Sequence, residues 1–93
     1  MAFIQSRREK ILSIAFLHGA HNLRIFGSYA RGDQRSDSDL DILADIDPDR
    51  SLLDQAALIR ELQELLNMNV DLVEPACLHT FIRESVLSEA IPL

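Results

Sequence analysis

The sequence has little of what builds disulfide frameworks or membrane spans. Its 93 residues contain a single cysteine, Cys77, which has no partner for an intramolecular disulfide and fits a reducing compartment. No apolar run approaches the roughly 20 residues that span a bilayer. Residues 7–10 are all charged where a signal peptide would need an apolar segment. We therefore expect a cytoplasmic protein without a membrane anchor.

Basic residues are also scarce. The chain has 9 Lys and Arg residues against 15 Asp and Glu residues, which gives a formal net charge of −6. Because nucleic-acid affinity comes largely from cations that neutralise phosphates, direct DNA or RNA binding is not expected. A small nucleotide bound together with a cation, or a protein with a basic patch, suits this charge better. The length predicts a single domain over residues 1–93.

Hydrophobic periodicity predicts three helices and three short strands. Helices are expected over residues 3–18, 52–66 and 78–90, and strands over 23–26, 40–46 and 70–73. The loop between the first two strands is too short for a helical crossover, so these strands should pair antiparallel, whereas the next helix permits a parallel crossover. The order α-β-β-α-β-α predicts a small mixed β-sheet covered by helices, in the α/β or α+β class.

Two carboxylates mark the start of the second strand. Asp39 and Asp41 are two residues apart and should project from the same face, while Leu40 and Ile42 face the core. Mg²⁺ is usually held by one or two carboxylates together with phosphates and water. Asp71 stands in a similar apolar context on the third strand, where it could bind a second metal ion or accept a proton. The residues thus indicate a divalent-cation site.

These acids permit two other interpretations. Acids at strand starts are often simply solvated, and Asp39 alone fits that interpretation. An EF-hand calcium loop that begins at Asp37 would need glycine at its sixth position and an acid at its twelfth. Those positions are Ile42 and Pro48, so the calcium interpretation fails.

A glycine turn precedes the acids. Gly27 permits a backbone conformation that a side chain would forbid and lets another group approach closely. Ser28 supplies a hydroxyl and should begin one helical turn, and Arg31 could reach a phosphate or pair with an acid. The turn is neither a Walker loop nor a dinucleotide fingerprint, because Gly-Lys-Ser/Thr and G-x-G-x-x-G are both absent.

The combined pattern resembles a known family. Gly27-Ser28, ten intervening residues and Asp39-Leu40-Asp41 resemble the signature of the nucleotidyltransferase superfamily that includes DNA polymerase beta. The segments Gly-Ser-Tyr-Ala-Arg-Gly and Arg-Ser-Asp-Ser-Asp-Leu-Asp-Ile are similar to the corresponding motifs of its minimal nucleotidyltransferase branch. Asp71 sits where that branch places its third acid.

The resemblance implies a reaction and a role for each residue. Gly27 and Ser28, with Arg31 beside them, would bind the nucleotide triphosphate. Asp39, Asp41 and Asp71 would be the catalytic and metal-binding triad for one or two Mg²⁺ ions. An acceptor hydroxyl would attack the α-phosphorus of ATP, take AMP and release pyrophosphate.

The resemblance also implies a partner. Members of the minimal branch are commonly antitoxins whose partner is a HEPN-domain toxin, and some transfer AMP to a tyrosine of that toxin. Two alternatives stay open at this point. The chain could neutralise a toxin by binding alone, or act as a stand-alone transferase on a small molecule. Its homo- or hetero-oligomeric state is also open.

The remaining polar residues carry weaker predictions. The three histidines, His18, His21 and His79, show no metal-ligand spacing with the acids. We expect Tyr29 to pack as readily as to touch a nucleotide, and Asp37 to hold its loop by backbone hydrogen bonds. Cys77 is expected to be small and semi-buried rather than nucleophilic.

Overall fold

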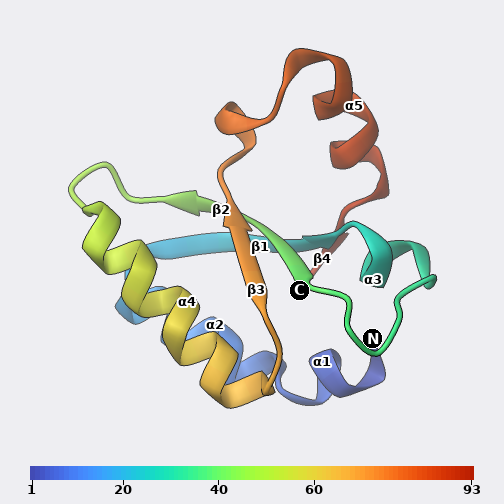
Figure 1. Cartoon of the computed structure of the whole chain (residues 1–93). Helices are drawn as coiled ribbons and strands as arrows, with labels where there is room; N and C mark the ends of the chain where they lie inside the picture. Colours follow the sequence, from blue (N-terminus) through green and yellow to red (C-terminus); the bar gives the residue numbers. More distant parts are fainter.

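A four-stranded mixed sheet forms the centre of the computed structural model, which describes all 93 residues (Figure 1). The strand order is β3-β2-β1-β4. Strand β1 pairs antiparallel with β2 and β4, and β2 pairs parallel with β3. The bounds are Ala20–Phe26 for β1, Leu40–Ile46 for β2, Val70–Val73 for β3 and Ile91–Pro92 for β4. The predicted fold class and both predicted pairings are confirmed.

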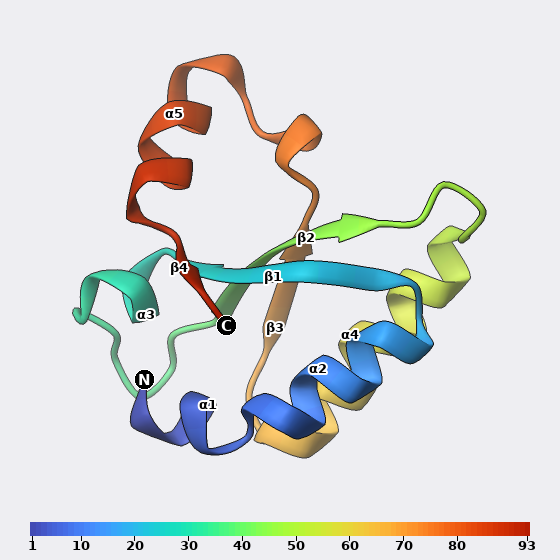
Figure 2. The same cartoon turned by 180° about the vertical axis from the view of Figure 1, so that it is seen from behind.

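The helices lie on the two sides of this sheet. Helices α2 and α4 cover one face, and α5 stands on the opposite side (Figures 1 and 2). The short α3 follows β1 directly. The helices are α1 Ala2–Ser6, α2 Arg8–Leu17, α3 Ser28–Arg31, α4 Leu52–Leu66 and α5 Thr80–Glu89. None of them is both long and apolar enough to cross a membrane.

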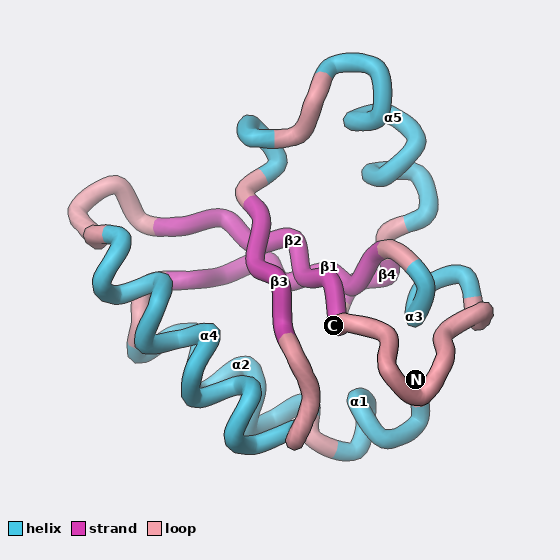
Figure 3. The backbone as a smooth tube through the Cα atoms, in the orientation of Figure 1, coloured by secondary structure: helices cyan, strands magenta, loops and turns pink.

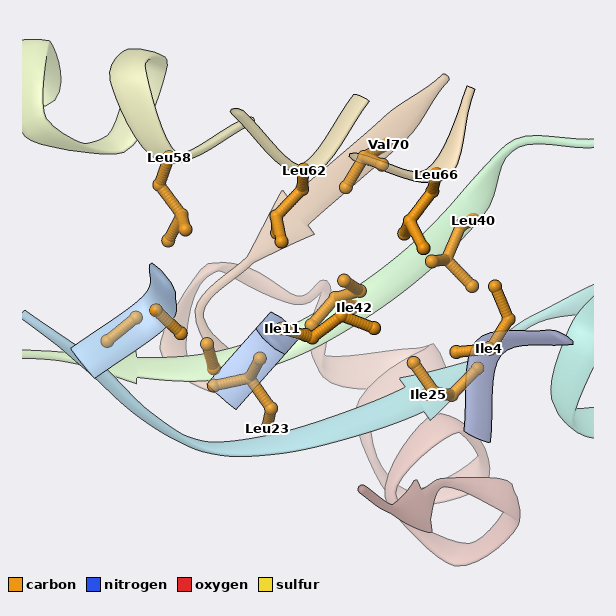
Figure 4. Close-up of a cluster of buried hydrophobic side chains, with 13 residues drawn as sticks. Ile4, Ile11, Leu23, Ile25, Leu40, Ile42, Leu58, Leu62, Leu66 and Val70 are labelled. Atoms are coloured by element: carbon orange, nitrogen blue, oxygen red, sulfur yellow. The ribbon is translucent and has the colours of Figure 1, made fainter. Parts of the chain in front are cut away.

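The hydrophobic core lies between the sheet and helices α2 and α4. Strand β2 sends its alternate residues Leu40, Ile42 and Ala44 into this core, where all three are fully buried. Leu58 and Leu62 of α4 face them from the other layer (Figure 4). The period-two alternation of β2 therefore puts Asp41 and Leu43 on the opposite face, where Leu43 is also fully buried.

Helix α4 has the bounds that its sequence predicts. Its leucines recur at helical spacing, and Leu58, Leu62 and Leu66 form the buried stripe. The Ser51 N–H donates to the carboxylate of Asp54 at 2.9 Å, which closes a capping box at the start of the helix. This hydrogen bond keeps the pKa of Asp54 below its ordinary value, since it stabilises the charged carboxylate.

The single helix predicted over residues 3–18 is wrong in one respect, because the chain breaks it at Arg7. There φ and ψ are −106° and 9°, and α1 ends while α2 begins at the next residue. The break lets Ile4 lie beside Ile25 and Leu40, while Ile11 lies in the same core cluster beside Ile42 (Figure 4). Burial of Ile4 at that site stabilises the fold more than an unbroken helix would. The residues on both sides of the break are polar, so no apolar contact there favours a continuous helix.

Strand β1 begins three residues before its predicted start at Leu23. Its pairing with β2 is irregular between His21 and Arg24, where Asn22 adopts a positive φ of 54°. A bulge of this kind adds a residue to one strand and disturbs the apolar alternation. The polar His21 and Asn22 therefore concealed the start of the strand.

The C-terminal region departs most from prediction. The helix expected over residues 78–90 is present as the slightly shorter α5, and an unpredicted 3₁₀ turn at Pro75–Cys77 precedes it. The apolar residues Leu78, Phe81, Ile82 and Val86 of this segment do not form one buried face. Leu78 is buried and Val86 half-buried, but Phe81 is 89% exposed and Ile82 50%. The chain then returns to add the unpredicted edge strand β4 (Figure 3).

Candidate active site

The three predicted acids converge on the face of the sheet opposite the α2–α4 core. Asp41 lies directly across from Asp71 in the parallel register of β2 and β3, so their side chains share one face. Asp39 precedes β2 and lies two residues before Asp41. Asp41 is half-buried, whereas Asp39 and Asp71 are exposed. The crossover through α4 thus unites residues that are 30 positions apart.

The electrostatics of Asp41 reflect its two acidic neighbours. Its pKa is raised above the ordinary value, first by burial and then by the negative charges of Asp71 and Asp39. The Arg31 guanidinium acts in the opposite sense and lowers the pKa, but it does not compensate. The site therefore holds an excess of negative charge that a cation would relieve.

Gly27 brings the turn against these acids. It connects β1 to α3 with φ 73° and ψ −149°, a conformation that L-residues rarely adopt. A Cβ atom at this position would lie 2.2 Å from Oδ2 of Asp41. The predicted need for glycine is confirmed, since both the backbone angle and the contact with Asp41 exclude a side chain.

The short helix predicted after the glycine is also present. Helix α3 starts at Ser28, which is half-buried, and the Arg31 N–H donates to the Gly27 carbonyl oxygen at 3.1 Å. Gly32 ends the turn in the left-handed conformation. The Arg31 guanidinium pairs with Asp33 at 3.3 Å, so it stays beside the turn. Gly27, Ser28 and Arg31 therefore form one edge of the site and the acids form the other.

Sequence reasoning missed one residue at this edge, Glu89. The Gly27 N–H donates to Oε1 of Glu89 at 3.2 Å, and Nη1 of Arg31 lies 3.4 Å from the same oxygen. Glu89 ends α5 and is 62 positions from Gly27. No local sequence motif predicts this contact. The only signal available was the placement of an acid just before the apolar C-terminus.

The donor chemistry of the acids fits Mg²⁺. Carboxylate oxygens are hard ligands, and the mutual repulsion at Asp41 favours a divalent cation. No group of three or more Asp, Glu, His or Cys side chains is arranged to hold a metal ion by itself. The predicted set of three metal-binding acids is therefore not preassembled in this structure, and a Mg²⁺ ion held there would need substrate phosphates and water to complete its shell.

The three histidines have partners outside this site. His18 pairs with Glu61, His21 lies 3.3 Å from Asp47, and His79 accepts the Phe81 N–H at the start of α5. Tyr29 packs against the hydrophobic core, as expected.

Two of these predictions are wrong. Asp37 holds nothing in its loop, because the Ser38 hydroxyl oxygen accepts the Arg35 N–H at 2.8 Å instead. Cys77 is exposed rather than semi-buried, since it lies on the 3₁₀ turn between β3 and α5.

A comparison with known families agrees with this geometry. The model of the nucleotidyltransferase domain matches residues 8–93. The chain therefore belongs to the nucleotidyltransferase domain family. The predicted enzyme class is confirmed by this match, which spans the Gly27 turn and all three acids.

Individual relatives place the chain in the minimal branch. It is 41% identical over 91 residues to a protein adenylyltransferase, MntA, of Thermococcus cleftensis, covering 89% of this chain and 92% of the relative. A solved structure described as a candidate minimal nucleotidyltransferase is 49% identical, with a TM-score of 0.86 over 97% of this chain and 92% of that one. A mutant MntA–HpeT toxin–antitoxin structure is 25% identical, with a TM-score of 0.74 and coverage of 92% and 70%.

Proposed function

We propose that this protein transfers AMP from ATP to a hydroxyl group of a partner protein, with Mg²⁺, and thereby acts as the antitoxin of a HEPN-domain toxin. The observation that carries the proposal is the close approach of Gly27 to Asp41, which sets the glycine turn and its hydrogen-bond donors against three converging carboxylates. This arrangement offers a place for phosphates and a place for cations side by side.

The residues divide the work of binding. The Gly27 N–H, the Ser28 hydroxyl and the Arg31 guanidinium are donors on one edge, and they would hold the phosphate oxygens of the nucleotide. Asp39 and Asp41 would hold Mg²⁺ on the other edge, with Asp71 as a further ligand. The bound ion would neutralise charge that develops on the transferred phosphoryl group. The chain itself would chiefly position the reactants.

Beyond these binding roles, the chemical step needs a proton acceptor from the protein. The acceptor hydroxyl oxygen would form a bond to the α-phosphorus while the bond from that phosphorus to the β-phosphate bridging oxygen breaks. Pyrophosphate leaves with the electron pair. The hydroxyl proton would pass to Asp71, which is exposed and lies across from Asp41.

Relatives support the choice of acceptor. A 41% identical relative is named a protein adenylyltransferase, and MntA is part of a solved toxin–antitoxin pair. The net charge of −6 suits a partner with a basic surface better than an RNA end. A tyrosine hydroxyl of a HEPN toxin is the acceptor we propose.

The test is transfer of label from α-³²P-ATP to the toxin in the presence of Mg²⁺. Wild-type protein should label the toxin, and Asp39→Asn combined with Asp41→Asn should lower the rate by at least about 100-fold, the order expected for loss of a charge-stabilising group. Asp37→Asn is the matched control, because this nearby loop acid makes no hydrogen bond and should leave the rate unchanged. Chelation of Mg²⁺ should abolish labelling in every case.

A toxin neutralisation assay separates transfer from binding alone. We expect the double Asn variant to form the complex but to lose neutralisation. If that variant neutralises the toxin at the wild-type dose, then binding suffices and the proposed antitoxin mechanism is wrong. Labelling of the toxin at the wild-type rate by the same variant would instead refute the proposed site.

A further inference from the structure

Glu89 occupies the donor edge of the candidate site. Its Oε1 accepts the Gly27 N–H at 3.2 Å and lies 3.4 Å from Nη1 of Arg31. The Glu89 side chain is only 26% exposed, so it is seated against the turn rather than extended into solvent. Two donors from one turn thus converge on a single carboxylate oxygen that comes from the far end of the chain.

A carboxylate in this position imitates a phosphate. Both groups are anions that present oxygen acceptors to N–H donors, and both bind arginine well. A backbone N–H carries one hydrogen, so the Gly27 donor cannot serve Glu89 and a nucleotide phosphate fully at once. A phosphate that shared Arg31 with Glu89 would also face a second negative charge at short range.

The way α5 is attached allows Glu89 to move. No residue of α5 is buried, and the helix stands away from the sheet (Figures 1 and 3). At its start, Nη2 of Arg83 donates to the carbonyl oxygens of Ala76 and Leu78. After its end, Ile91 pairs with Ile25 of β1. The last turn lies between these two anchors and could loosen while both remain in place.

We propose that Glu89 is a built-in competitor of the nucleotide. Its carboxylate holds the phosphate position while no nucleotide is bound, and the triphosphate displaces it on binding and loosens the last turn of α5. This inference rests on the proposed nucleotide site, since the Gly27 N–H and the Arg31 guanidinium are the donors assigned there to the phosphates. This competition is reciprocal. Nucleotide binding weakens the contact of Glu89 with the turn, and holding α5 in place weakens nucleotide binding by the same factor.

The first test is the dissociation constant of ATP with Mg²⁺, measured by calorimetry. Glu89→Ala and Glu89→Gln should each bind ATP more tightly, by about fivefold, the order expected for one partly exposed charged contact. Glu84→Gln is the matched control. It removes an acid from the exposed side of the same helix, where the structure gives the side chain no partner, and should match wild type.

The second test uses the unaltered protein. Hydrogen exchange of amides in the last turn of α5 should become faster when ATP and Mg²⁺ are added, whereas exchange in α4 should not change. Slower exchange in the last turn of α5 would overturn the inference, whatever the variants do.

The outcomes separate this inference from the proposed function. If wild type binds ATP and the Glu89 variants bind it equally well or more weakly, the competitor role is wrong while the nucleotide site stands. Weaker binding would make Glu89 a residue that positions Arg31. If neither wild type nor the Glu89 variants bind ATP, the nucleotide site itself is wrong and the inference falls with it.

Discussion

Strand β2 has two faces with opposite chemistry. Leu40, Ile42 and Ala44 are fully buried against α2 and α4, and nothing polar lies among them. Asp39 and Asp41 project from the other face, where Asp41 is half-buried beside Asp71 with too little positive charge nearby. One seven-residue strand thus carries the centre of the core and the centre of the candidate site.

The difference between the faces shows where the stability of this protein is concentrated. Burial of the apolar face lowers the free energy of the folded chain. The acidic face has the reverse effect, because burial and like charges raise the pKa of Asp41 and make its ionised form unfavourable. The apolar face holds the acids in place despite their repulsion, which is the usual relation between a scaffold and a functional site.

Loss of the apolar face should have the largest effect on stability. Ile42→Ala should lower the free energy of unfolding by about 3 kcal/mol, since it leaves a cavity in a fully buried position. Urea unfolding followed by circular dichroism measures this change. Leu53→Ala is the control, because Leu53 is 81% exposed and its loss should cost less than about 0.5 kcal/mol. Equal costs at the two positions would refute the assignment of the core.

The next largest effect should appear at the glycine that meets the acidic face. Gly27→Ala should reduce AMP transfer by at least about tenfold and destabilise the fold by about 1–3 kcal/mol, because it combines a strained φ with a collision at Asp41. Gly32→Ala is a matched control. Gly32 has a similar φ of 80°, but an added Cβ would meet no atom within 4 Å. The Gly32→Ala variant should therefore be destabilised by the backbone strain but should retain AMP transfer.

The smallest effect should be a gain in the free energy of unfolding. Asp41→Asn should stabilise the metal-free protein at pH 7, by less than about 1 kcal/mol because solvent screens a partly exposed group. The sign follows from the raised pKa of Asp41. The folded state binds its proton more tightly than the unfolded state, so this residue lowers stability as the pH rises through the folded pKa. Thermal unfolding with a chelator, from pH 4 to pH 8, measures both effects.

The Asn variant should also lack the Asp41 contribution to the pH dependence. Asp37→Asn, which removes an exposed acid without a partner, should leave both the stability and its pH profile close to wild type. A destabilised Asp41→Asn protein would show that Asp41 makes a favourable contact in the folded state, contrary to the repulsion that we describe.

Local signals were strong enough to predict the elements that position the acids. Both β2 and α4 have the predicted bounds, because each combines a clear apolar period with a marked start or end. The break at Arg7 and the strand β4 were missed. Each depends on contacts with distant residues, such as those of Ile4 with Ile25 and of Ile91 with β1. Local propensity does not depend on such contacts, so it could not predict either feature.

The candidate site divides in the same way. Gly27 and the Asp39–Asp41 pair form a pattern within fifteen residues, so their use together could be predicted. Asp71 could be predicted only on the condition that β3 lies beside β2, which the parallel register now satisfies. Glu89 could not be predicted at all, because its place depends on how α5 returns across the end of the sheet.

The sequence by itself determined the alternation of β2, the glycine that its turn requires and the chemistry of the acids, because these follow from side-chain type and backbone geometry over a few residues. Only the tertiary structure decided that Asp71 joins the pair and that Glu89 lies against Gly27. The physical reason is that both contacts join separate elements, and packing of the whole chain rather than local preference determines where those elements meet.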